Sequence, residues 1–223
     1  GKWHLGHRKK YLPLQNGFDE YAGLICSNDM WPVDYNGEPI VGEKRSYYPP
    51  MSFWVGNEPT EVIRSLEDQG QLTTKITELA VDFIKRNKDN PFFLYLAHTA
   101  PHTPLLLNEN NKGKSKRGSY GDVVEELDRS VGRILETLKN LKLSENTFVI
   151  FTSDNGPWSW VNIDGGSSGL LKGNKGSVYE GGYRVPAIAW MPGSIDQGII
   201  SQSLSSTLDL YPTMLAMTGN EKF

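Results

Sequence analysis

Two adjacent oxygen-bearing side chains, Asp154 and Asn155, stand where an apolar segment ends and a Gly-Pro turn begins. The preceding residues 148–151 are continuously apolar and rich in β-formers, which predicts a buried strand. Ligands of open α/β sheets bind at the carboxyl ends of strands, so a carboxylate and an amide here predict a site for a hard divalent cation. Asp, Asn, Gly and Pro are also the commonest turn residues, and this stretch alone fits an ordinary turn equally.

The four histidines of the chain fall in two places. His4 and His7 lie near its start, and His98 and His102 follow a second apolar segment, 91–97, which also predicts a buried strand. Histidine suits proton transfer near neutral pH. Any single one of the four is equally well explained as a hydrogen-bonded loop residue.

Lys2 and Lys175 are candidates for holding an anionic oxygen, because lysine supplies a compact positive charge. Either lysine alone is an ordinary surface residue. Asp, Asn, Lys and His side chains, most of them in Gly- or Pro-rich turns beside predicted strand ends, together predict a metal-assisted site for an anionic ester.

Two amphipathic helices are expected to carry these loops. Apolar residues recur at helical spacing over 73–87, with Thr73 as N-cap, and over 119–141, where Ser119 and Asp122 have capping-box spacing. The order of strand, helix and strand predicts a parallel crossover. The fold class is therefore α/β: a largely parallel mixed sheet with helices on both faces.

The remaining segments are predicted from composition. Residues 1–58 are expected to form long ordered loops, and the charged segment 108–118 a flexible surface loop. Residues 185–190 predict a strand with Pro186 at its start or at a sheet edge. Asp209 is expected to cap a short helix that Gly219 ends. No repeat or linker divides the chain, so residues 1–223 are expected to form one unit.

The bulk composition excludes several classes of protein. With 38% hydrophobic residues in 223, the chain can bury a core. A net charge of −3 gives no general attraction to nucleic acid or membranes. No stretch approaches the roughly 18 apolar residues of a membrane helix. A single cysteine, Cys26, excludes an internal disulfide.

The chain resembles the sulfatases of the alkaline phosphatase superfamily, most closely the arylsulfatase A-like members. The matching stretches keep the family's order from end to end. They are Gly1–Gly6, Gly17–Ser27, Pro91–Tyr95 with His102–Pro104, Phe151–Pro157, Ser168–Leu171 with Lys175–Gly176, Tyr179–Gly182, and Leu208–Leu210 with Pro212–Thr213.

The resemblance implies roles for the candidate residues. Asp154 and Asn155 would be two ligands of one divalent cation, usually Ca²⁺, in an alkaline phosphatase-like sulfatase fold. Lys2 and Lys175 would bind sulfate oxygens. Ser27 matches a substrate-contacting serine of the arylsulfatase A-like members.

The resemblance also assigns two histidines. His102 would bind the sulfate ester, and either His102 or Lys175 would protonate the departing oxygen. His4 would be the base that releases sulfate. No role is assigned to His7 or His98.

One element of the family pattern is missing. The family's nucleophile is a formylglycine made within a Cys/Ser-x-Pro-x-Arg motif, which these 223 residues do not contain, since Cys26 is followed by Ser-Asn-Asp. In the family this motif lies upstream. The chain is therefore expected to be a catalytic-domain fragment without the nucleophile segment and the C-terminal subdomain, and to be inactive alone.

Two alternatives to a formylglycine-dependent and metal-dependent sulfatase stay open. One is a phosphate or phosphonate ester hydrolase of the same superfamily, and the other is an inactive fragment that binds sulfated glycans. The expected partner is a sulfated small molecule or glycan, with no nucleic acid and no membrane span; the oligomeric state stays open. The single cysteine and the lack of an Asn-x-Ser/Thr acceptor together favour a bacterial protein. The expected location is periplasmic or secreted, or lysosomal or extracellular if the protein is eukaryotic.

Overall fold

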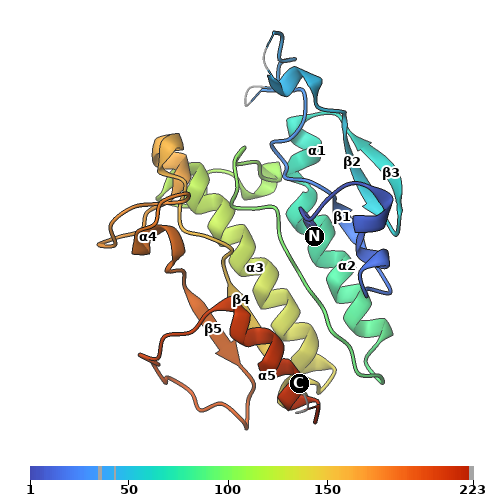
Figure 1. The fold of residues 1–223 in the computed structure, drawn as a ribbon, viewed down its shortest axis with the longest axis vertical. Coiled ribbons are helices and arrows are strands. Elements are labelled where there is room, and N and C mark those ends of the chain that lie inside the picture. The colour runs from blue at the N-terminus through green and yellow to red at the C-terminus, as the bar shows by residue number, and fades with distance from the viewer. Residues whose placement is uncertain (35–36, 43, 221–223) are drawn as a thin grey trace. The chain divides into compact units, whose positions relative to one another are not determined.

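The computed structural model describes residues 1–34, 37–42 and 44–220. The chain divides into two compact units, residues 1–191 and residues 192–223, and each is described by itself. The larger unit contains a three-stranded sheet, a pair of long helices and a two-stranded ribbon (Figure 1).

The three-stranded sheet is antiparallel, in the order β1 (Ala22–Leu24), β2 (Met51–Val55) and β3 (Glu58–Ile63). The prediction of loops throughout residues 1–58 is wrong for this part of the chain. Strands of three to six residues show too little alternation to be distinguished from loop, and the alternation of β2 appears only as burial after folding.

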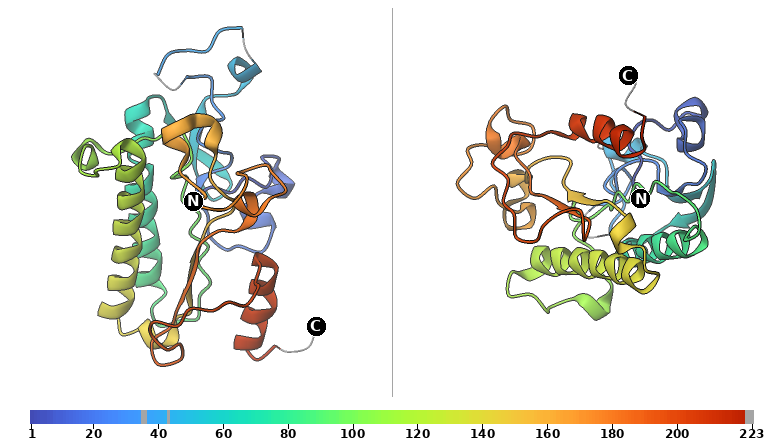
Figure 2. Two further views of the ribbon diagram at one scale, coloured as in Figure 1. Left: turned by 90° about the vertical axis from the view of Figure 1, so that its left-hand side faces the viewer. Right: turned by 90° about the horizontal axis from the view of Figure 1, so that it is seen from below.

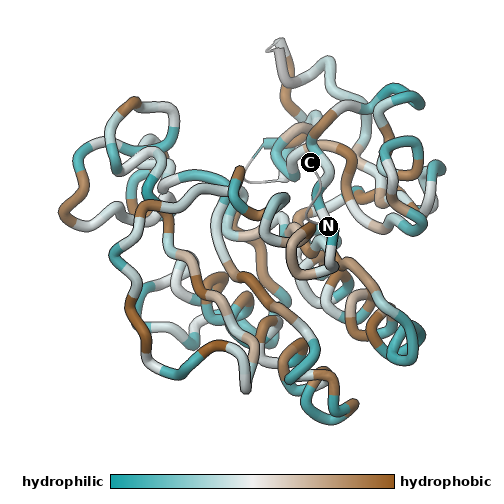
Figure 3. The backbone as a smooth tube through the Cα atoms, turned by 60° about the horizontal axis from the view of Figure 1, so that its bottom comes forward, coloured by the Kyte–Doolittle hydropathy of each residue, from teal (hydrophilic) through white to brown (hydrophobic). Residues whose placement is uncertain are grey.

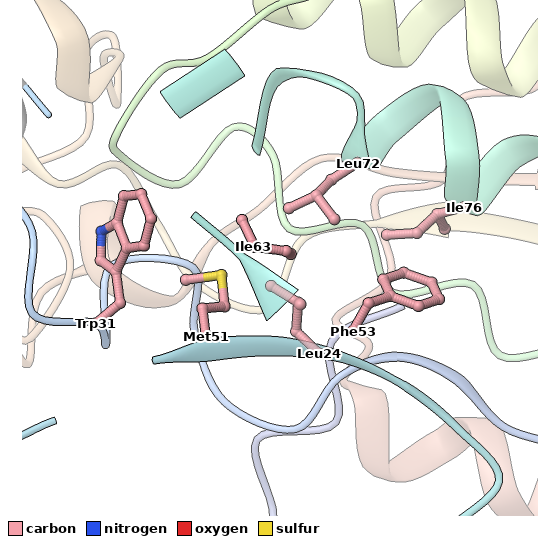
Figure 4. Close-up of a cluster of buried hydrophobic side chains, with 7 residues drawn as sticks. All are labelled: Leu24, Trp31, Met51, Phe53, Ile63, Leu72 and Ile76. Atoms are coloured by element: carbon pink, nitrogen blue, oxygen red, sulfur yellow. The ribbon is translucent and has the colours of Figure 1, made fainter. Parts of the chain in front are cut away.

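The main core lies between this sheet and the helices that follow it (Figure 4). A capping box at Ser65 begins the short helix α1 (Leu66–Gly70), which leads into α2 (Leu72–Arg86). Each fully buried apolar side chain contributes about 1.5–3 kcal/mol. The cluster consists of Leu24, Trp31, Met51, Phe53, Ile63, Leu72 and Ile76.

The predicted N-cap of α2 is wrong. The helix begins after Gln71, and Thr73 is buried inside its first turn. The Thr73 carbonyl there accepts a hydrogen bond of 2.6 Å from the Thr77 hydroxyl. Packing against the core therefore decides the position of Thr73, overriding its preference for a cap.

The second predicted helix is confirmed as α3 (Gly118–Asn140), which packs beside α2 (Figures 1 and 2). Hydrophobic and hydrophilic segments alternate along both helices, as expected when one face is buried (Figure 3). The residues they bury between them are Ala80, Val81, Ile84, Ile134 and Leu138.

The predicted capping box of Ser119 and Asp122 is wrong, because α3 begins after Arg117 and Ser119 lies inside its first turn. Asp122 instead fastens the preceding loop to the helix. Its buried carboxylate accepts backbone hydrogen bonds from Ser115, Gly113 and Lys114 at 2.6–2.9 Å. These bonds, led by that from Ser115, lower the pKa of Asp122. The segment 108–118, expected to be flexible, is therefore held in place, with one turn of 3₁₀ helix at Glu109–Asn111.

The predicted parallel crossover is not confirmed among the described residues, whose named strands pair antiparallel. Strand β4 (Val149–Thr152) pairs with β5 (Ala187–Trp190), confirming both strand positions, but the pair is antiparallel. Residues 91–97 form no strand, and their side chains are exposed or half-buried, with Phe93 at 57% and Tyr95 at 58%. An apolar run indicates that a segment can form a strand. It does not indicate which segment pairs with it, and that partner decides the direction and the burial of the strand.

Short helices complete both units. The larger unit also contains the short helix α4 (Glu180–Tyr183). Its further 3₁₀ turns are Lys9–Tyr11, Pro13–Gln15, Lys44–Tyr47, Ser144–Asn146 and Ser159–Gly165.

The smaller unit contains a 3₁₀ turn, Thr207–Asp209, and helix α5 (Leu210–Met217). Asp209 occupies the N-cap position of α5, as predicted, but its side chain makes no capping hydrogen bond to that helix. Its carboxylate accepts a hydrogen bond from the Ser206 amide. The predicted stop is confirmed, because Gly219 follows the helix at φ 76°.

A buried polar chain links the two long helices. Thr77 of α2 lies 2.6 Å from Ser130 of α3, whose hydroxyl lies 3.0 Å from His98 Nε2. Since Thr77 donates to the Thr73 carbonyl, Ser130 donates to Thr77 and His98 Nε2–H donates to Ser130. Burial lowers the pKa of His98 to about 4, so the ring is neutral near pH 7.

The lowered pKa of His98 predicts that the folded protein loses stability in acid. Its ordinary pKa of 6.5 applies when unfolded, so the unfolded state binds more protons as pH falls from 6.5 towards 4. Urea unfolding should show the free energy of unfolding decreasing by about 2 kcal/mol from this group between pH 7 and pH 5. His98→Gln should flatten this dependence, whereas His7→Gln, at an exposed histidine, should not. Equal profiles for both variants would contradict the assignment.

Candidate functional site

Lys2 and His4 enter the site on an extended segment held by backbone hydrogen bonds on both sides. The Lys2 amide donates to the Ala97 carbonyl at 2.7 Å, and the His4 amide donates to the Ile25 carbonyl at 2.9 Å. His4 has φ 57°, a left-handed conformation that is uncommon for any residue other than glycine. The neighbouring chain therefore imposes an unfavourable backbone at this histidine, as often occurs at functional sites.

The electrostatics of His4 show which groups surround it. Partial burial and the positive charge of Lys2 lower the pKa of His4, and the nearby Asp29 carboxylate opposes them. His102 and Lys175 lower it further. The structure therefore brings together the four basic residues that the sequence singled out, from three separate stretches of chain.

His102 has a defined tautomer. Its Nδ1 lies 2.7 Å from the Thr103 carbonyl, which can only accept, so Nδ1 carries the hydrogen. The Asp29 carboxylate lies 4.0 Å from the same nitrogen. Nε2 is left as the atom for exchanging a proton with a ligand. The half-buried ring also stacks on Trp158, with centroids 5.8 Å apart and planes at 30°.

Lys175 reaches the site from a glycine-rich loop. Its amide donates to the Pro157 carbonyl at 2.9 Å, which joins this loop to the one that follows β4. Its ammonium lies 5.7 Å from the centre of the Trp158 ring, a cation–π distance. Trp158 therefore contacts two of the predicted site residues.

Asp154 and Asn155 lie in the turn just after β4, separated from it by Ser153, as predicted from the sequence. Asp154 is exposed, and the Asn155 amide nitrogen donates to the Gly156 carbonyl at 2.9 Å, which identifies Oδ1 as its available ligand atom. Both oxygens suit Ca²⁺, which takes six to eight oxygen ligands. Over residues 1–34, 37–42 and 44–220 no three His, Cys, Asp or Glu side chains group into a metal site. The pair therefore fits part of a cation site.

Glycines set the spacing between these loops. The Gly156 amide donates to the Gly182 carbonyl, and the Gly181 amide donates to the Lys172 carbonyl, at 2.9 and 2.8 Å. A Cβ on Gly156 would lie 1.8 Å from the Gly181 oxygen, and one on Gly181 would lie 2.1 Å from the Gly173 oxygen. Helix α4 thus lies in backbone contact with both loops, which no larger residue would permit.

Ser27 lies in a buried loop beside His102. It is 4% exposed, and its hydroxyl has no hydrogen-bond partner among the residues that the structure describes. The adjacent Asn28 is held by Gln69, whose amide donates to the Asn28 carbonyl at 2.9 Å, and its own amide lies 3.5 Å from the His102 carbonyl. An unpaired buried hydroxyl is compatible with a ligand contact.

Sequence reasoning missed two members of the site. Asp29 follows Ser27 by two positions and Trp158 follows the Gly-Pro turn, but no spacing rule marks either. Trp158 was considered only as a loop aromatic that could line a pocket or pack in the core. His98 lies in the helix interface described above, and His7 is exposed.

Comparisons with known proteins agree on one family. The family model described as Sulfatase matches residues 1–220. N-acetylgalactosamine-6-sulfatase from Canis lupus familiaris is 43% identical over 98% of this chain and 42% of its own length, and human arylsulfatase A is 36% identical over 98% and 44%. The chain thus spans less than half the length of these relatives.

Solved structures give the same result. The PsFucS1 sulfatase from Pseudoalteromonas sp. has a TM-score of 0.91 at 30% identity, covering 98% of this chain and 47% of its own. The Ps i-CgsB complex with k-i-k-neocarrahexaose has a TM-score of 0.80 at 32% identity, covering 100% and 50%.

The backbone contact at α4 predicts the effect of one added methyl group. Gly156→Ala should lower the free energy of unfolding by about 1–3 kcal/mol in urea titrations, because its Cβ meets the Gly181 oxygen. Gly132→Ala, in α3 with open space around it, should instead stabilise by about 0.5–1 kcal/mol. The contact would be unimportant if both variants were equally stable.

Proposed function

Since this chain belongs to the sulfatase family, we propose that the protein hydrolyses sulfuric esters at the site around His4. The observation that supports this function is the convergence of Lys2, His102 and Lys175 on His4. Such a group of basic side chains attracts an anionic ester and stabilises charge that develops on it.

Each basic residue has a separate proposed role. Lys2 and Lys175 bind sulfate oxygens and offset the negative charge on them and on the leaving group. His102 binds the ester, and its Nε2, or the Lys175 ammonium, supplies the proton to the departing oxygen. His4 acts as the base that releases sulfate, a role favoured by its lowered pKa, since burial and the charge of Lys2 favour the neutral ring. The Ser27 hydroxyl contacts the substrate.

Two groups of the proposed reaction are not supplied in full by this chain. Asp154 and Asn155 would hold a divalent cation, proposed to be Ca²⁺, which acts as a Lewis acid when bound. The nucleophile is proposed to be a formylglycine outside residues 1–223, because no Cys/Ser-x-Pro-x-Arg motif lies within them. Residues 1–223 are accordingly proposed to be a catalytic-domain fragment that does not turn over sulfate esters alone.

Sulfated carbohydrates are the proposed natural substrates. N-acetylgalactosamine-6-sulfatases are among the most similar relatives, and one structural neighbour is in complex with a neocarrahexaose. Simple aryl sulfates are proposed as further substrates because arylsulfatases A and G are also similar.

No described helix is long and apolar enough to cross a membrane. A periplasmic, secreted or lysosomal location is proposed.

The first test compares two ester types and two lysines. The full-length enzyme containing residues 1–223 should hydrolyse 4-nitrophenyl sulfate and N-acetylgalactosamine 6-sulfate in preference to 4-nitrophenyl phosphate. Lys175→Ala should lower kcat/KM by about 100-fold, because it removes one positive group from the anion. Lys172→Ala should have little effect, since this exposed lysine lies over Tyr179. A preference for the phosphate ester would refute the sulfatase and favour the phosphatase alternative.

The second test concerns the cation. Asp154→Ala in the same enzyme should weaken Ca²⁺ binding by about tenfold or more in calorimetry, because a charged oxygen ligand is lost. Asp164→Ala removes an exposed carboxylate from the next loop and should leave the affinity unchanged. Unchanged Ca²⁺ affinity and activity in Asp154→Ala would rule out the metal role.

A further inference from the structure

We propose that Trp158 is a positioning residue of this site, whose indole ring holds the His102 ring and the Lys175 ammonium beside one bound anion. The proposal rests on the function proposed above and adds a residue to it. The two contacts are the stacking at 5.8 Å and the cation–π distance of 5.7 Å. They join a histidine and a lysine that lie 73 positions apart in the chain.

The main chain around Trp158 is fixed on three sides. Its amide donates to the Gly165 carbonyl at 3.1 Å, and its carbonyl accepts from the Val161 amide at 3.3 Å. The preceding carbonyl, that of Pro157, accepts from the Lys175 amide. A Cβ on Gly165 would lie 2.0 Å from the Trp158 oxygen, so this turn is also in tight backbone contact. The indole is therefore attached to a rigid support.

The electrostatics explain why an aromatic ring suits this position. The Lys175 side chain has many rotamers, so its ammonium needs a contact that holds it near His102 before an anion arrives. The face of an indole carries negative potential, so it attracts the Lys175 ammonium and stacks on the His102 ring without competing as a ligand for the anion, as a carboxylate would. An aliphatic side chain of similar size would fill the space but provide no such attraction.

Trp158 also connects the anion-binding side of the site to the proposed cation side. It follows Asn155 by three residues in the loop that α4 holds through Gly156. Any displacement of that loop would move the indole and so alter both of its contacts. The neighbouring Trp160, which is 79% exposed, provides a matched control on the same loop.

The test uses the full-length enzyme with Trp158→Leu, Trp158→Phe and Trp160→Leu. Trp158→Leu should lower kcat/KM about tenfold on both 4-nitrophenyl sulfate and N-acetylgalactosamine 6-sulfate, and weaken inhibition by inorganic sulfate. Trp158→Phe should restore most of both, because a ring face returns. Trp160→Leu should change neither. Circular dichroism and urea unfolding confirm that each variant is folded.

A double-mutant cycle completes the test. If Trp158 acts through Lys175, adding Trp158→Leu to Lys175→Ala should cost less than Trp158→Leu alone. Full additivity, no rescue by phenylalanine, or a loss confined to the sugar substrate would overturn the proposal, the last indicating direct stacking on the sugar. Failure of the unsubstituted enzyme to hydrolyse sulfate esters would refute the proposed function. Turnover that survives Trp158→Leu unchanged would overturn the positioning role alone.

Discussion

Backbone-to-backbone contact at glycines is the constraint on which the rest of the site depends. Gly156 and Gly181 lie so close to neighbouring carbonyls that a Cβ on either would meet an oxygen, at 1.8 Å and 2.1 Å respectively. Main-chain hydrogen bonds in the same places fix the loop after β4 against the loop that carries Lys175. Main chain is a stiffer support than side chain, because it has no rotamers to average over. The relative positions of Asp154 and Lys175 follow from this contact.

A second backbone contact brings in the other half of the site. The segment that begins at Gly1 lies beside Leu24 and Ala97 and donates a hydrogen bond to the carbonyl of each. A Cβ on Gly23 would lie 1.8 Å from the Gly1 oxygen. The strained conformation of His4 directly follows this segment. The geometry of the basic cluster is thus set by paired main chain, which is how a site keeps several like charges close together.

The charges themselves favour a ligand that is anionic. Three basic groups lower the pKa of His4, and among described residues Asp29 opposes them. Such a cluster is unfavourable when empty and becomes favourable when an anion binds, so in the proposed reaction its binding energy is available for the charge that develops. The interface between α2 and α3, in contrast, excludes charge. It buries His98 in its neutral form inside a chain of hydroxyl groups, where a positive charge has no compensation.

The sequence by itself determined the family, both long helices, the strand that precedes Asp154, and the list of residues for the basic cluster, because motifs and helical periodicity are local properties. The tertiary structure decided the rest. The direction of β4 and β5, the exposure of residues 91–97 and the true role of Asp122 depend on partners distant in the chain. Trp158 shows the difference most clearly. Its residue type was visible as one aromatic among several, but its position between His102 and Lys175 exists only once three loops have been brought together by folding.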